Sequence, residues 1–183
     1  MRLIKIKNKK HEINTMVLAA MFLGIGFILP IFTNQIKEIG DSLLPMHIPV
    51  MLCGLICGKR YGFFVGLILP LLRGFAFGMP PIYPNAVWMA IELSVYGFVI
   101  GFLYFRINPK DTKSVYISLV SAMIIGRLAW GISKTILMGL NGKAFTASMF
   151  IAGGFVDAIP GIILQLVLIP SIMLILNKRR ILK

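Results

Sequence analysis

Acidic side chains are scarce in this sequence, whose 183 residues include only 6 Asp and Glu against 19 Lys and Arg. The resulting formal charge of +13 could suit a nucleic-acid partner, but the basic residues lie between apolar runs and are not interleaved with aromatic residues. Several of these runs approach the length needed to cross a hydrocarbon layer about 30 Å thick, and 58% of the residues are hydrophobic. The composition therefore indicates an integral membrane protein.

Sequence motifs for catalysis, metal binding and ATP hydrolysis are also missing. The stretch "GLNGKAFT" does not have the spacing of a phosphate-binding loop, and no serine nucleophile elbow or H-E-x-x-H helix occurs. His11 and His47 are too few and too far apart for a histidine metal site, and Cys53 and Cys57 are expected to be small buried side chains. We therefore expect no enzyme activity, no cofactor and no bound metal.

The apolar runs predict an all-α bundle of six transmembrane helices in a single membrane domain covering residues 1–183. The expected spans are 14–31, 46–58, 61–78, 84–105, 114–139 and 146–176, with a short basic N-terminal segment at 1–13 and a basic tail at 177–183. The start resembles the charged leader of a signal peptide. No small-x-small cleavage site follows the first run, however, so we expect an uncleaved helix.

The distribution of positive charge between the spans predicts their orientation. With the N-terminus inside, 14 of the basic residues outside the spans are cytoplasmic, and only Lys37 and Lys143 lie in external loops. An even number of spans places both termini in the cytoplasm.

Small residues at helical spacing predict close helix packing. These pairs and ladders are Gly54 with Gly58, Gly62 with Gly66, Gly97 with Gly101, and Ser118, Ala122 and Gly126.

The second span, 46–58, is too short to cross a bilayer alone, since 13 residues at 1.5 Å each extend about 20 Å. Pro45 favours extended backbone before the helix, and Pro49 suits its first turn. Irregular backbone at this depth is tolerated where it lines a cavity. We expect the loop 33–44 to fold over an outward-facing cavity with His47 near its floor or wall. Alternatively, His47 is an interfacial residue that touches lipid headgroups.

Five ionisable side chains fall inside the predicted spans, and residue counting places all of them in the outer half of the membrane. They are Arg73, Glu92, Arg127, Lys134 and Asp157. Because each costs about 2.5–3.5 kcal/mol to insert, such groups usually face the bundle interior and mark a path for a substrate or ion. The five charges sum to +1, which favours a ligand with one carboxylate. A purely structural network of ion pairs is the alternative.

Aromatic and polar residues share a face with these charges. Asn85, Trp88, Glu92 and Tyr96 have the spacing of one helix face, and so do Arg127, Trp130 and Lys134. Rings that supply contact area and polar groups that fix orientation suit a small organic ligand. Asp157 precedes Pro160, which lacks the N–H that would bond the carbonyl of Val156, and this leaves an acceptor beside the carboxylate.

The stretch "LLPMHIPVMLCGLICGKRYGFFVGLILPLLRGFAFGMPPIYPNAVWMAIELSVYGFVIGFLY", residues 43–104, resembles the substrate-binding (S) component of energy-coupling factor (ECF) vitamin transporters. The resemblance implies a six-helix subunit of the bacterial cytoplasmic membrane that captures a water-soluble vitamin in its outer half. It also implies an energising module made of one membrane scaffold protein and two ATPases. Members of the family dock on the scaffold through an A-x-x-x-A face in the first helix, which Ala20 and Gly24 match with one glycine replacement.

The vitamin itself is less determined than the family. Sequences with this H-I-P-V and G-M-P-P character are similar to pantothenate-type members, and a mildly basic pocket agrees with the carboxylate of pantothenate. Pyridoxine, a hydroxymethylpyrimidine or a folate-like compound are alternatives within the family.

Two alternative functions lie outside this family. One is a self-contained proton-coupled transporter that uses Glu92 or Asp157 as a relay. The other is a membrane enzyme that acts on a lipid headgroup.

Overall fold

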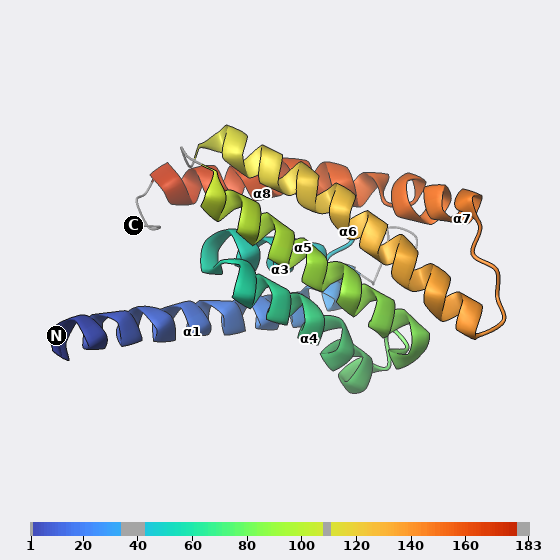
Figure 1. The fold of residues 1–183 in the computed structure, drawn as a ribbon, viewed down its shortest axis with the longest axis horizontal. Coiled ribbons are helices and arrows are strands. Elements are labelled where there is room, and N and C mark those ends of the chain that lie inside the picture. Colours follow the sequence, from blue (N-terminus) through green and yellow to red (C-terminus); the bar gives the residue numbers. More distant parts are fainter. Residues whose placement is uncertain (1, 34–42, 108–110, 179–183) are drawn as a thin grey trace.

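The computed structural model describes residues 2–33, 43–107 and 111–178, and within these ranges the chain consists of helices joined by turns and short irregular segments, with no strand. The elements are α1 (Arg2–Thr33), α3 (His47–Cys57), α4 (Lys59–Phe77), the π-helical turn η1 (Ile82–Ala86), α5 (Val87–Arg106), α6 (Thr112–Leu140), α7 (Ala147–Ile151), the π-helical turn η2 (Ala152–Val156) and α8 (Ile159–Lys178). The first turns of α1 and the last turns of α8 lie at the same end of the bundle (Figure 1).

The predicted all-α membrane fold is confirmed at the level of helices that can span a bilayer. Five stretches of the described chain are long and apolar enough to cross: Glu12–Thr33, Lys59–Phe77, Ile82–Arg106, Thr112–Leu140 and Ile159–Lys178. The remaining expected span, 46–58, corresponds to α3, which has only 11 residues. Six spanning helices and two cytoplasmic termini therefore stay predictions.

Two element boundaries differ from the sequence prediction. Helix α1 begins at Arg2, whereas a separate basic segment was expected up to residue 13; no Gly or Pro occurs before Gly24 to end the helix. The expected last span, 146–176, is divided into α7, η2 and α8. Gly153 and Gly154 weaken the helix there, and Pro160 is placed in the first turn of α8, where its missing N–H costs nothing.

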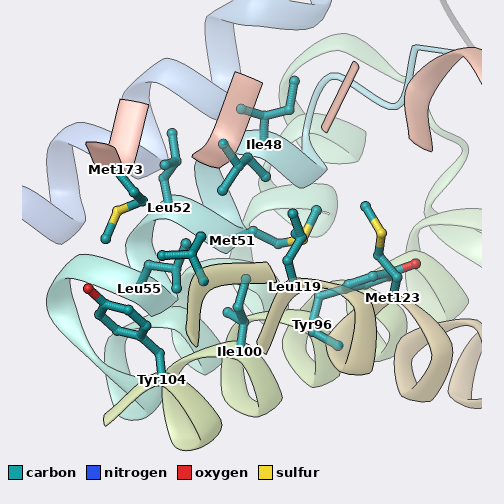
Figure 2. Packing of buried hydrophobic residues seen from close by; sticks show 13 residues of the cluster. Ile48, Met51, Leu52, Leu55, Tyr96, Ile100, Tyr104, Leu119, Met123 and Met173 are labelled. Atoms are coloured by element: carbon teal, nitrogen blue, oxygen red, sulfur yellow. The ribbon is translucent and has the colours of Figure 1, made fainter. Parts of the chain in front are cut away.

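The short helix α3 is enclosed by the longer helices around it. Its Met51 and Leu55 pack against Tyr96 and Ile100 of α5 and against Leu119 of α6, and each of the five is no more than 2% exposed (Figure 2). Because neighbouring helices cover α3, a helix too short to span the membrane is buried in protein and not exposed to lipid. Its first residue, His47, is thereby held inside the bundle.

Most of the predicted small-residue positions are close helix contacts, and Gly58 is the exception, since a Cβ atom added there would meet only the Phe105 ring at 3.9 Å. A Cβ atom added at Gly54 of α3 would lie 2.6 Å from the carbonyl oxygen of Gly97 on α5, and one at Gly101 would lie 2.6 Å from the backbone nitrogen of Lys59. Gly62 and Gly97 also touch through their backbones. These contacts fix α3, α4 and α5 against one another and so set the positions of the side chains they carry.

Gly54→Ala should lower the free energy of unfolding by about 1–3 kcal/mol, because the added methyl group meets backbone that cannot rotate away. Thermal unfolding of the purified protein in detergent measures the effect. Gly139→Ala is the matched control, since a Cβ atom there has nothing within 4 Å. Equal melting temperatures for the two variants would contradict the contact between α3 and α5.

Candidate ligand-binding site

A cavity of about 340 Å³ lies where the ends of α1 and α4, the start of α3, and α5 and α6 converge. Its lining consists of Pro30, Leu44, Pro45, Met46, His47, Arg73, Met79, Pro80, Pro81, Asn85, Trp88, Met89, Glu92, Arg127, Trp130 and Gly153. This volume is in the range of small-molecule sites, which are typically about 300–1,000 Å³. The lining combines apolar and aromatic walls with a few charged groups.

Seven of the ten residues predicted to bind a ligand line this one cavity. They are His47, Arg73, Asn85, Trp88, Glu92, Arg127 and Trp130, and they come from α3, α4, η1, α5 and α6. Residues up to 83 positions apart in the sequence, His47 and Trp130, are thus brought to one place. The predicted clustering is present in the structure, and the binding role of these residues stays a prediction.

Among the described residues of the lining, Glu92 is the only acidic one, and it is 2% exposed. Arg127 donates a hydrogen bond from Nη1 to Glu92 Oε1 at 3.0 Å, and His47 Nε2 lies 3.4 Å from the same oxygen. His47 is itself 2% exposed, so it lines the cavity and is not at the lipid interface. The structural ion-pair alternative therefore applies to Glu92 and Arg127, whose charges compensate each other.

Arg73 differs from Arg127 because no carboxylate lies within 4 Å of it among the described residues. Its Nη1 donates to the carbonyl oxygen of Phe27 at 2.6 Å, which ties α4 to α1, and its guanidinium lies 5.2 Å from the centre of the Phe77 ring. The side chain is 4% exposed. Among the described residues this buried cation has only neutral partners, so its charge is not compensated there.

Several hydrogen-bond donors around the cavity have no partner in the described part of the chain. These are Arg73 Nε and Arg127 Nε and Nη2, and His47 Nδ1 is likewise buried without a partner. Buried polar groups in native proteins are nearly always paired, so such a group needs a specific explanation. A ligand carboxylate or hydroxyl in the cavity would accept these bonds.

Lys134 lies beside the cavity and does not belong to its lining. Its ammonium is 4.5 Å from the ring centre of Trp130, 5.3 Å from that of Trp88 and 5.2 Å from that of Phe145. Trp88 and Trp130 both face the cavity, so Lys134 holds two of its aromatic walls in place through cation–π contacts. Its positive charge also adds to the potential at the site.

The other two predicted residues lie outside the cavity. Tyr96 is 2% exposed and packs edge-on against His47, with ring centres 5.1 Å apart, so it lies beneath the cavity as part of the core. Asp157 is exposed and does not line the cavity. The expected covering loop, 33–44, falls mostly outside the described residues, although Leu44 does line the cavity.

Sequence reasoning missed the proline-rich wall of the site. Met79, Pro80 and Pro81 line the cavity, and they precede η1, in which Tyr83 has the extended angles φ −121° and ψ 132°. The signal was present in "GMPPIYPN", because three prolines in five residues end α4 and delay the start of α5. Non-helical backbone at the edge of a cavity agrees with the rule applied to Pro45.

The predicted docking residues of α1 are accessible. Ala20 is exposed, and a Cβ atom added at Gly24 would have nothing within 4 Å. Within the described part of the chain, neither residue is enclosed by a neighbouring helix. The small-residue face is therefore free to contact another helix, and the identity of that helix stays a prediction.

Comparison with known proteins agrees with this architecture. No curated protein and no solved structure shows a significant match to the chain. The family model of the ECF transporter substrate-specific component matches residues 14–173, which covers all of the cavity-lining residues. This is a family of transporter subunits and not of enzymes. The chain belongs to the family of substrate-specific components of ECF transporters.

Proposed function

We propose that this substrate-specific component captures a small water-soluble vitamin or precursor with one carboxylate, with pantothenate as the leading candidate, in an outward-facing cavity. The observation that carries the proposal is the pair of buried guanidinium groups, Arg73 and Arg127, whose unpartnered donors border the cavity. A carboxylate fits guanidinium donors in geometry and charge.

The charge balance of the site supports a monoanionic ligand. Among the ionisable lining residues, Arg73 and Arg127 are positive and Glu92 is negative, and Lys134 adds a further positive charge next to the two indoles. Asp157, which was expected to contribute to this balance, is exposed and does not line the cavity. Asn85, Trp88 and Trp130 would supply an amide and two flat apolar surfaces to the hydroxyl, amide and methyl groups of pantothenate.

Energy for import would come from a partner module. The sequence contains no phosphate-binding loop, and membership of the family implies partnership with an ECF module. We propose that this module consists of one membrane scaffold protein and two ATPases.

We also propose that the subunit spans the bacterial cytoplasmic membrane with both termini inside. The common end of α1 and α8 is consistent with that topology (Figure 1).

Mass spectrometry of small molecules that copurify with the detergent-solubilised protein tests the proposed ligand. We expect a monocarboxylate, pantothenate first, at close to one equivalent per chain, and we expect titration calorimetry with added pantothenate to give the same stoichiometry. A cationic or uncharged copurified solute that pantothenate does not displace would contradict the proposal.

The self-contained proton-coupled transporter is favoured by one observation, the buried contact of His47 with Glu92 at 3.4 Å, which a proton relay would use. The two mechanisms differ in their energy source. In vesicles that contain the chain and its module, an ionophore that collapses the proton gradient while ATP is kept constant should leave uptake unchanged. Loss of uptake under this condition would favour the relay.

A further inference from the structure

A second cavity, of about 690 Å³, lies at the other end of α4 and α5 from the ligand site. It is lined by Cys57, Gly58, Lys59, Arg60, Tyr61, Gly101, Phe102, Phe105 and Arg106. Three of these residues are cations and none is acidic. No carboxylate lies within 4 Å of the three cations in the part of the chain that the structure describes.

Aromatic contacts place two of these cations at one phenylalanine ring. The ammonium of Lys59 lies 4.9 Å from the centre of the Phe102 ring, and the guanidinium of Arg106 lies 5.4 Å from the centre of the same ring. Gly58, at φ 90°, makes the turn between α3 and α4 that places Lys59 here. Like charges held near one ring without a counter-charge create a site for an anion.

An apolar groove of about 350 Å³ adjoins the cationic cavity. Its lining consists of Arg60, Phe63, Phe64, Val95 and Phe98, so Arg60 belongs to both. Lys59 also spans the boundary, with its ammonium 5.8 Å from the centre of the Phe98 ring. Phe64 is 57% exposed and Phe98 is 41% exposed on the outside of the bundle. A cationic compartment thus continues directly into an apolar channel between α4 and α5.

We propose that these two compartments bind one anionic glycerophospholipid, with its phosphate among Lys59, Arg60 and Arg106 and an acyl chain along the groove. The continuity of charge and apolar surface matches an amphiphile, and neither compartment alone would specify one. Basic pockets between transmembrane helices bind anionic headgroups in this way. The lipid site is separate from the vitamin cavity, shares no lining residue with it, and does not depend on the proposed ligand.

Native mass spectrometry of the full chain in detergent tests the proposal, with phosphatidylglycerol and phosphatidylcholine of identical acyl chains as probes. We expect clear preference for phosphatidylglycerol. Arg60→Gln should weaken its binding about fivefold, since one cation near an anionic lipid contributes about 1 kcal/mol. Combining it with Lys59→Gln and Arg106→Gln should weaken binding about 100-fold. Lys113→Gln, an exposed lysine that lines neither compartment, is the charge-matched control.

A variant of the groove and a soluble probe separate a lipid from a free phosphate. Val95→Phe should narrow the groove and weaken both phospholipids, and glycerol 3-phosphate should not compete with phosphatidylglycerol at equal concentration. Competition by glycerol 3-phosphate would reduce the site to a phosphate site. Equal binding of the two phospholipids, or equal losses in Arg60→Gln and Lys113→Gln, would overturn the proposal.

Discussion

Arg73→Met should weaken binding of pantothenate roughly 100-fold while it leaves the melting temperature of the purified subunit almost unchanged. Truncating one partner of a buried charge pair costs about 2–5 kcal/mol, and the ligand carboxylate would be that partner. Within the subunit, the substitution removes only the hydrogen bond from Arg73 to the Phe27 carbonyl. It also removes a buried cation that has no counter-charge among the described residues, and this gain in stability offsets the loss of the bond. Titration calorimetry and thermal unfolding measure the two effects.

Two other arginines make this prediction specific. Arg127→Met should destabilise the subunit by about 3–5 kcal/mol, because it leaves the buried Glu92 carboxylate without its partner at 3.0 Å. Arg106→Met changes the same residue type at the opposite end of α4 and α5 and should leave pantothenate binding unaffected. If Arg73→Met binds the copurified solute as tightly as the unaltered protein, Arg73 does not contact the ligand.

Much of the site was predictable because membrane burial makes charged residues conspicuous. Arg73, Glu92 and Arg127 could be identified from the cost of their charge alone, and all three line the cavity. Helical spacing then added Asn85, Trp88 and Trp130. The pairing of Glu92 with Arg127 was left open, since several bases were available in the sequence and only their distances distinguish between them.

Residue counting was less accurate where the helices are interrupted. Asp157 was expected in the outer half of one continuous span, but η2 widens the helix just before it and shifts the direction of the following side chains. The carboxylate is therefore exposed and outside the cavity. The proline-rich wall was missed for a related reason, since spacing rules describe regular helices and residues 79–81 are not helical.

The short second span shows how a length argument can locate a cavity. Eleven residues of α3 cannot cross a bilayer, so the chain before the helix must enter the bundle as irregular backbone. Leu44, Pro45 and Met46 do so and line the cavity together with His47. The length of α3 and the position of the site are thus two consequences of one constraint, the need to cover backbone polar groups.

Ala20→Leu and Gly24→Leu, each alone, should reduce vitamin uptake to background while changing ligand affinity of the purified subunit by no more than about twofold. Small-residue faces allow close helix approach in lipid, and the bulk of even one added leucine side chain does not fit such a contact. Within the subunit the same bulk is harmless, since Ala20 is exposed and Gly24 faces open space. Uptake in cells that contain the module, beside calorimetry on the isolated subunit, measures both quantities.

Gly139→Leu provides the matched control, because it adds the same bulk at another glycine with nothing within 4 Å and lies on α6, away from the α1 face. It should leave both uptake and binding intact. Full uptake in both α1 variants would exclude this face as the docking surface for the scaffold protein. Simultaneous loss of uptake and binding would instead indicate misfolding. Loss of uptake alone is the result that assigns α1 to coupling with the module and the cavity to capture of the ligand.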